Sequence, residues 1–232
     1  MKQLIQFLRL IPLLFVLFVM SCSEGSHTGQ LSEGIIEYKV EYVSDSAIAL
    51  ATQMLPKTMT LKFKRHLSVN RIAGFFGFFE IANYADARKG TNSTCLKILD
   101  NKYSYSSKEN DPLCCFDPFD GMSIVFHDGE TKQIAGYKCL RATAHFENNN
   151  HKDFDIYYTQ DIDVKSPNTN NPFHDIHGVL MQFSLKMRNL NMVITADAVK
   201  SGDFKSSEFD LPKGYKPISK QKMEEYLFTM LE

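Results

Sequence analysis

Apolar and polar residues alternate one by one in four segments of the chain. The segments run from Ile36 to Tyr42, from Met59 to Lys64, from Val179 to Lys186 and from Leu190 to Ala196. Because successive side chains of a strand point to opposite faces of a sheet, this period predicts strands with one buried face and one wet face. In the third segment Leu180 falls on the polar side of the pattern. Half-buried strands of this kind are typical of an antiparallel sheet.

Further strand signals fill the rest of the chain. Thr131 to Phe146 reads as a polar strand that bends at Gly136 and continues as a second, longer strand, and Asp155 to Ile162 favours another. Four shorter segments at roughly ten-residue spacing have the composition of strands and turns; they are Leu67 to Arg71, Thr94 to Leu99, Lys102 to Ser106 and Met122 to His127. Gly136, Gly178 and Gly214 are interpreted as kinks and turns that let the sheet bend. The fold class expected is therefore mainly β, with a strongly curved antiparallel sheet.

Two segments have a helical period instead. Asp45 to Leu55 is closed by Pro56, and Asp45 or Ser46 is the predicted N-cap. Near the C-terminus Ser219 is the predicted cap of a second helix. Its apolar stripe consists of Met223, Tyr226, Leu227, Met230 and Leu231. We expect the first helix to act as a lid over the sheet.

The N-terminus has the parts of an export signal. Lys2 and Arg9 are positive, and Ile11 to Met20 is an apolar run far shorter than the roughly 20 residues of a membrane-spanning helix. A small residue, Ser21, then precedes Cys22, which resembles the lipobox of bacterial lipoproteins, where the cysteine sulfur receives diacylglycerol. We expect cleavage before Cys22 and a lipid anchor on it. The alternative is an ordinary secretory signal beside an incidental cysteine.

This signal defines the expected organisation of the chain. Residues 1–21 are the lipoprotein signal peptide, residues 22–33 are a polar tether rich in Gly and Ser, and residues 34–232 are one domain. Two or more acyl chains make a durable membrane anchor. The expected location is the outer membrane, facing the periplasm or the cell surface, with the membrane itself as a partner.

Charge and composition limit the class of ligand. The net charge of −1 becomes −3 without Lys2 and Arg9, because 24 basic residues then stand against 27 acidic ones. A nucleic-acid partner needs a basic face and is not expected. The chain has no Trp but 18 Phe, 10 Tyr and 10 Met, which suit a core or the lining of a lipid pocket.

Besides Cys22 there are four cysteines, Cys95, Cys114, Cys115 and Cys139. An even set in an exported chain indicates disulfides, with three pairings open. Neighbouring cysteines rarely bond to each other, so Cys114 and Cys115 would each have to reach Cys95 or Cys139. No C-x-x-C spacing occurs, and neither a zinc site nor a redox motif is expected.

The segment Phe75-Phe76-Gly77-Phe78-Phe79 places four aromatic rings around one glycine. One interpretation is a central strand covered on both faces. The other is a mobile aromatic flap that contacts an acyl chain or the membrane surface.

Several motifs resemble one family of exported bacterial proteins. Ile134 to Cys139 reads I-A-G-Y-K-C, followed by Ala142-Thr143, and Tyr157 to Ile162 reads Y-Y-T-Q-D-I. Asp175 to Leu180 and the closing Phe209 to Tyr215, F-D-L-P-K-G-Y, complete the set. Residues 34 to 216 thus resemble the GLPGLI family and its uncharacterised lipoprotein relatives, with Tyr157 in place of Trp and the Leu-Pro pair lost. The resemblance implies a LolA-like half-barrel with helices across its concave side.

Groups that carry chemistry are sparse. His174 and His177 share the spacing of metal ligands but have no evident third partner, and Cys114-Cys115 beside His127 is a weak candidate nucleophile. Asp153, Asp155, Asp161 and Asp163 alternate with apolar residues, as on a solvated strand face. No nucleophile elbow, phosphate loop or H-E-x-x-H is present. We expect no catalytic residue, metal or cofactor, and no enzyme.

The leading hypothesis is a non-enzymatic lipoprotein that binds a lipid or other hydrophobic molecule in the concave face of the half-barrel. Its expected lining consists of Ile48, Met54, Leu55, Phe63, Phe75, Phe76, Phe78, Phe79, Met181 and Phe183. The alternative is an envelope protein–protein interaction module whose interior is filled by its own side chains.

Overall fold

The structure is a computed structural model, and it describes residues 30–43, 55–108, 111, 113–116, 119–147, 151–188 and 190–231. The predicted signal peptide, the predicted anchor at Cys22 and the lid helix as far as residue 54 lie outside these residues. Among the described residues there is one α-helix.

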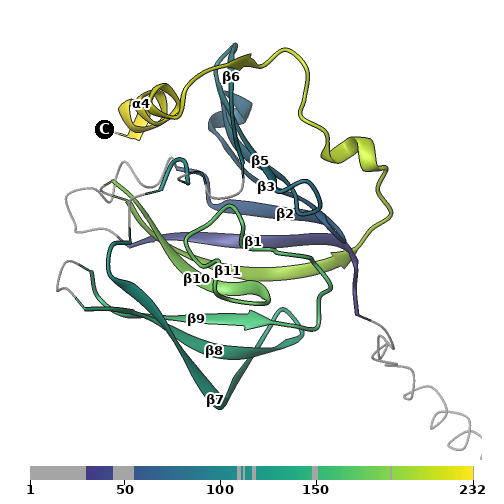
Figure 1. The fold of residues 1–232 in the computed structure, drawn as a ribbon, viewed down its shortest axis with the longest axis vertical. Coiled ribbons are helices and arrows are strands. Elements are labelled where there is room, and N and C mark those ends of the chain that lie inside the picture. The colour runs from purple at the N-terminus through teal and green to yellow at the C-terminus, as the bar shows by residue number, and fades with distance from the viewer. Residues whose placement is uncertain are drawn as a thin grey trace, which may run out of the picture.

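The twelve strands of the described residues join in a single sheet (Figure 1). Their order across the sheet is β12-β6-β5-β4-β3-β2-β1-β11-β10-β9-β8-β7. Neighbours are antiparallel except β12, which pairs parallel to β6. The ends of the sheet, β12 and β7, are not joined to each other, so the sheet is open. The prediction of a mainly β, antiparallel fold is confirmed. The strands are β1 (Glu33–Val43), β2 (Thr58–Lys64), β3 (Leu67–Gly74), β4 (Phe79–Asp86), β5 (Thr91–Ile98), β6 (Asn101–Lys108), β7 (Met122–Ile134), β8 (Tyr137–Phe146), β9 (Phe154–Thr159), β10 (Val179–Met187), β11 (Leu190–Ser201) and β12 (Lys216–Pro217).

The predicted alternation is the reason why one face of the sheet, here called the core face, is buried. On β1 the side chains of Ile36, Tyr38 and Val40 are buried while those between them are more exposed. The same holds for Met59, Leu61 and Phe63 on β2, and for the inward residues of β10 and β11. A smaller cluster covers the outer face of β3 to β5, where Phe209 of the 3-10 turn η3 (Ser206–Phe209) packs.

The expected bend at Gly136 is instead a complete reversal of the chain. Ile134 pairs with Tyr137, so β7 and β8 form a hairpin around a two-residue turn. Both turn residues have positive φ, 48° at Ala135 and 82° at Gly136, as the tightest hairpin turns require. The real bend lies earlier in β7, where the pairing register shifts between His127 and Thr131 and Gly129 has a φ of 78°.

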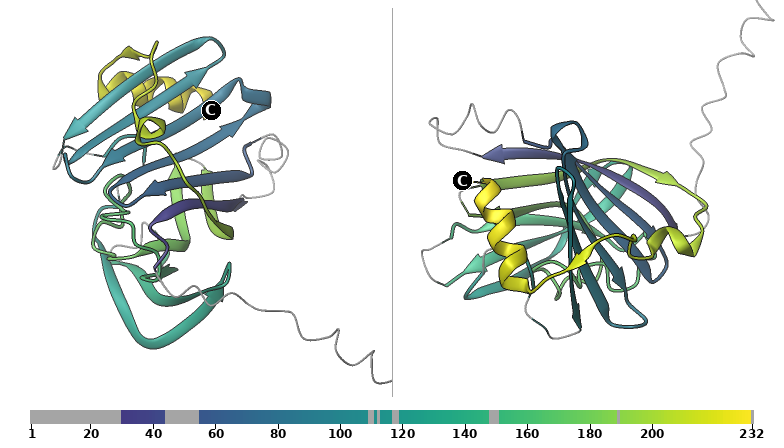
Figure 2. Two further views of the ribbon diagram at one scale, coloured as in Figure 1. Left: turned by 90° about the vertical axis from the view of Figure 1, so that its right-hand side faces the viewer. Right: turned by 90° about the horizontal axis from the view of Figure 1, so that it is seen from above.

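The C-terminal helix is α4 (Lys220–Leu231), as predicted. Its cap is the predicted Ser219, whose Oγ accepts a hydrogen bond from the backbone N–H of Lys222 at 3.3 Å. Met223 and Leu227 are almost completely buried against the core face. Figure 2 shows α4 beside the β4–β6 end of the sheet, away from β7 and β8.

The last residues of the predicted tether contact the domain. Leu31 bridges to Ile162, and the backbone N–H of Arg65 donates to the carbonyl oxygen of Ser32 at 2.7 Å. These contacts place the start of the chain's described part at the end of the sheet where β1 begins.

Candidate functional site

The core face holds two small neighbouring cavities. The first has a volume of about 70 Å³ and is lined by apolar side chains of β2, β3, β4, β10 and β11, together with Cys115 and Phe116. Polar residues, among them Asn70, Asn83 and Asn171, also line it. The second, about 30 Å³, shares four lining residues with the first and is bounded by Leu55 and by Leu227 of α4; the shared residues are Ile72, Ile81, Met187 and Met192. An engineered apolar cavity that takes up benzene measures about 150 Å³. Neither cavity therefore has room for an acyl chain among the described residues.

The protein's own side chains fill this face. Phe173 and Ile176, from the segment between β9 and β10, are fully buried, as are Met223 and Leu227 of α4. Asn168 holds that segment in place, because its Nδ2 donates to the carbonyl oxygens of Ile176 at 2.7 Å and Gly178 at 3.0 Å. The insertion of this segment into the core was not predicted from the sequence, although the turn-forming residues of Asn168 to Pro172 indicate that the chain folds back there.

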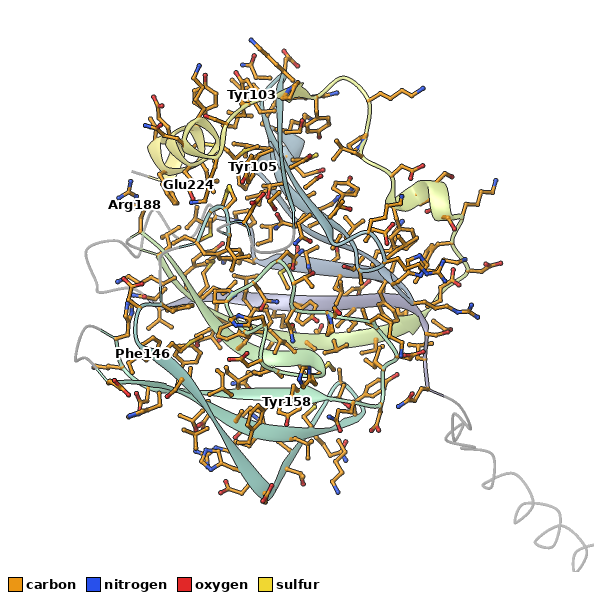
Figure 3. The ribbon with its side chains drawn as sticks, in the orientation of Figure 1. Tyr103, Tyr105, Phe146, Tyr158, Arg188 and Glu224 are labelled. Carbon is orange, nitrogen blue, oxygen red and sulfur yellow. A yellow bond between two sulfur atoms is a disulfide. The ribbon has the colours of Figure 1, made fainter. Side chains whose placement is uncertain are left out.

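α4 contacts β6, the β10–β11 turn and the backbone at Cys115. The ring of its Tyr226 lies 4.8 Å from that of Tyr103 on β6, and Arg188, in the turn between β10 and β11, stacks over Phe228 at 4.5 Å. Glu224 accepts a hydrogen bond from the backbone N–H of Cys115 at 3.2 Å. In Figure 3 Tyr103, Arg188 and Glu224 lie in the upper part of the molecule, and Phe146 and Tyr158 lie in the lower part.

The predicted lining residues are divided among three environments. Phe183 lines the larger cavity, and Leu55 and Phe79 line the smaller one. Phe63 and Met181 are fully buried in the core but line neither cavity. Phe76 and Phe78 are exposed. Ile48, Met54 and the side chain of Phe75 lie outside the described part of the chain.

The aromatic segment is not the central strand of the first interpretation. Phe75–Gly77 forms the 3-10 turn η2 at the tip of the β3–β4 hairpin, and only Phe79 enters a strand with a buried side chain. Phe76 is fully exposed because the left-handed turn, with a φ of 55° at this residue, directs it away from the sheet.

Cys114 and Cys115 are joined to each other by a disulfide. The expectation that each of them bonds to Cys95 or Cys139 is therefore wrong, because those two cysteines lie elsewhere on the sheet. Cys95 belongs to the cluster on the outer face, whereas Cys139 lies on β8 near the far end of the sheet. Both are free thiols, and burial raises the pKa of Cys95 to about 12 and that of Cys139 to about 11. Neither is a reactive nucleophile.

A polar end of the sheet lies opposite the β3–β4 tip. Two open clefts of about 450 and 420 Å³ flank the segment from Lys165 to Gly178 there. Asp86, Asn92, Ser107 and His174 are among the residues that line the first. His174 lies 3.3 Å from the carboxylate of Asp175, and no group of three potential metal ligands occurs among the described residues.

The carboxylates of Asp153, Asp155 and Asp163 each have a separate partner and do not converge. Asp153 pairs with His145 at 2.7 Å, Asp155 with Arg141 at 2.9 Å, and Asp163 with Lys165 at 2.8 Å. The Arg141 guanidinium holds the pKa of Asp155 below its usual value, because it stabilises the ionised carboxylate. The side chains of these three residues are exposed or partly exposed, but only Asp155 lies on a strand, so the predicted solvated strand face applies to Asp155 alone.

Beside them, His127 contacts Thr143, with 2.8 Å between Nε2 and Oγ1. The Cys114–Cys115 disulfide leaves no thiolate for His127 to activate. No constellation with a nucleophile and a base is present in this part of the structure.

Comparison with known proteins gives a likeness of fold. No family model matches the chain, and no curated protein matches it. Among solved structures, those of PNGF-II in space groups P21 and C2 are similar, with TM-scores of 0.55 and 0.54 and 13% identity in both. They match 85% and 84% of this chain, which spans only 33% and 32% of PNGF-II. The class defined by fold is thus an open, antiparallel single-sheet protein with a C-terminal helix.

Proposed function

We propose that this chain is a non-enzymatic protein of the cell envelope that is lipid-anchored through Cys22 and acts through its outer surface as an interaction module. The export signal, the residue pair Ser21-Cys22 and the polar segment after it support the anchor. The proposed location is the outer membrane, facing the periplasm or the cell surface. Within the described residues no helix is both long and apolar enough to cross a bilayer.

The observation that carries this function is the filled core face. Phe173, Ile176, Met223 and Leu227 are buried in the cluster on the core face, which is the face expected to bind a hydrophobic ligand. Among the described residues this face contains a cavity of about 70 Å³ and a smaller one of about 30 Å³. A filled interior favours an interaction module over a lipid carrier.

Binding of a hydrophobic ligand is the second candidate. Met59, Met187 and Met192 surround the larger cavity, and thioether side chains repack easily around a guest. Leu55, at the end of the proposed lid helix, borders the smaller cavity. In this candidate the lid and the aromatic segment would open to admit the ligand.

Mass spectrometry separates the two candidates. The full chain is purified from membranes, delipidated, exposed to total lipid extract and measured under native conditions. An interaction module retains only the acyl groups attached to Cys22, and the matched Cys22→Ser variant lacks these too. One noncovalent lipid per chain, in the wild type and in Cys22→Ser alike, would contradict the module and support the ligand-binding candidate.

A further inference from the structure

One end of the sheet carries an apolar rim, defined here as the exposed side chains of Val43, Phe76, Phe78 and Leu99. The strand register brings them together. Gly74 pairs with Phe79 and Phe79 with Ile98, so the β3–β4 and β5–β6 tips lie side by side. Val43 ends β1 at the same edge, because β1 runs antiparallel to β2 and β2 to β3.

The rim has a rigid backbone. The N–H of Leu99 donates to the carbonyl oxygen of Phe78 at 2.6 Å, which joins the two tips directly. Lys97 Nζ donates to the carbonyl oxygen of Gly77 at 2.8 Å. Backbone groups that are already hydrogen-bonded can enter an apolar medium at low cost.

Phe76 contributes nothing to the packing of the described fold. Its side chain is fully exposed, and its φ of 55° is a conformation that suits Gly or Asn rather than Phe. The other three rim residues, Val43, Phe78 and Leu99, are more than half exposed as well. An apolar cluster of this kind marks a surface that is covered by something else.

The charges next to the rim are mainly positive. Lys57 and Lys102 are exposed beside the tips, Lys97 faces Lys102 across β5 and β6, and Arg188 lies in the β10–β11 turn of the same edge. The acidic residues nearby are Glu41 and Asp100, together with Glu80, which pairs with Arg71. Cationic side chains around protruding aromatic rings complement anionic lipid head groups.

We propose that the apolar rim inserts into the interface of a lipid bilayer that contains anionic lipids. The rim combines two rings of the β3–β4 tip, Phe76 and Phe78, with Leu99 of the β5–β6 tip and Val43. A fluid bilayer accommodates exposed apolar side chains without a matching pocket. This inference goes beyond the proposed function and does not depend on lipid at Cys22. The tether starts at the other end of β1, whose 11 residues span about 36 Å.

The absence of Trp allows a position-specific test. Three full-length variants, Phe76→Trp, Phe78→Trp and the matched control Phe126→Trp on the exposed part of β7, each carry a single tryptophan. They are mixed with vesicles of phosphatidylcholine and phosphatidylglycerol whose acyl chains are brominated. We expect a blue shift and strong quenching at positions 76 and 78 and neither at 126. All three share one N-terminus, so an anchor cannot produce the difference.

Two further double variants test which side chains supply the affinity for vesicles. Phe76→Ser with Phe78→Ser should lower vesicle affinity by about tenfold or more, because two ring burials are lost. Lys57→Glu with Lys102→Glu should weaken binding to anionic vesicles but leave binding to neutral vesicles unchanged. Circular dichroism and thermal unfolding verify that each variant is folded.

Three results would overturn the inference. The first is unquenched emission at position 76 in the presence of vesicles, and the second is equal quenching at 76 and 126, which shows non-specific adsorption. The third is a blue shift at position 76 that requires an envelope protein and not lipid, which would identify a protein surface as the occupant. None of these three results depends on acylation of Cys22. Failure of the rim proposal is therefore distinguishable from failure of the proposed lipid-anchored module.

Discussion

The hydroxyl of Tyr38 donates a hydrogen bond to the carbonyl oxygen of Leu180 at 2.9 Å, across the buried core face and 142 residues of chain. Leu180 lies where the register between β9 and β10 shifts, so that Tyr158 pairs with Leu180 and Tyr157 already pairs with Gln182. The bulge also explains why Leu180 is buried although the alternation placed it on the polar side. Burial raises the pKa of Tyr38 far above its usual value, so the hydroxyl remains a donor.

Removal of this hydroxyl should destabilise the fold. Tyr38→Phe leaves the Leu180 carbonyl oxygen in the core without its donor, and we expect a loss of about 1–3 kcal/mol in the free energy of unfolding. Urea titration measures it. Tyr157→Phe, on the partly exposed side of β9, is the matched control and should change stability by less than about 0.5 kcal/mol. Equal effects of the two substitutions would show that the Tyr38 bond contributes little.

Leu227 tests whether α4 is an integral part of the core. Leu227→Ala removes a side chain that is 1% exposed and enlarges a cavity that it lines, so we expect a loss of about 2–5 kcal/mol. Thr229→Ala, exposed on the same helix, should stay within about 0.5 kcal/mol of the wild type. Thermal unfolding compares them. A Leu227→Ala variant as stable as Thr229→Ala would mean that α4 is only loosely attached.

The elements that depend on the order of neighbouring residues could be predicted from the sequence. Met59, Leu61 and Phe63 alternate with polar residues and form a strand, and Ser219 caps the helix that buries Met223 and Leu227. These elements depend on periodicity and capping, which neighbouring residues determine.

Other parts depend on distant partners and could not be predicted in this way. Phe173 enters the core because Asn168 fixes its segment, and Leu180 is buried because of a bulge against β9. Phe76 and Phe79 have similar sequence neighbours, yet one lies on a turn tip and the other in a strand. Composition does not distinguish these environments.

The thiols provide a chemical test of the described core. In the folded protein at pH 8, Cys95 and Cys139 should react with iodoacetamide far more slowly than an exposed cysteine. Burial raises their pKa values to about 12 and about 11, and the thiol is the unreactive form. Both should be labelled rapidly in denaturant, which serves as the control. Peptide mapping should recover Cys114 linked to Cys115, and a peptide that joins Cys95 to Cys139 would contradict the structure.

The pair of His145 and Asp153 makes a pH-dependent contribution to stability. The hydrogen bond from His145 to Asp153 raises the pKa of the imidazole and lowers that of the carboxyl. Because the histidine pKa is higher in the folded state, the pair adds its full stability at pH values below the histidine's unfolded pKa. That stability is lost as the pH rises through the histidine's folded pKa. Because the Asp153 pKa is lower in the folded state, its contribution is present at pH values above the unfolded pKa of the carboxyl. It is lost as the pH falls through the folded pKa of Asp153. The pair therefore stabilises the β8–β9 hairpin most between roughly pH 4 and 6.5.

His145→Gln should thus lower the unfolding midpoint at pH 5.5 and have little effect at pH 8.5, where the wild-type imidazole has lost its charge. Differential scanning calorimetry across this range measures the change. His66→Gln, which changes a histidine with no ion pair among the described residues, is the control. A deficit of the His145→Gln variant that is the same at both pH values would show that the charge pair is not its cause.

Substitutions of Phe76 distinguish a residue kept for fold stability from one kept for the apolar rim. Asn tolerates a φ of 55° better than Phe does, and the ring of Phe76 has no packing to lose, so Phe76→Asn should raise the free energy of unfolding by about 0.5–1 kcal/mol. Phe79→Ala, three residues away in β4, should instead cost about 3–5 kcal/mol because its ring is buried. Chemical denaturation of both variants measures the contrast. A Phe76→Asn variant that is more stable yet no longer binds anionic vesicles would show that the fold retains an unfavourable residue because the rim requires it. A clear loss of stability in Phe76→Asn would show instead that the ring supports the hairpin and that the backbone at this residue is not strained by Phe.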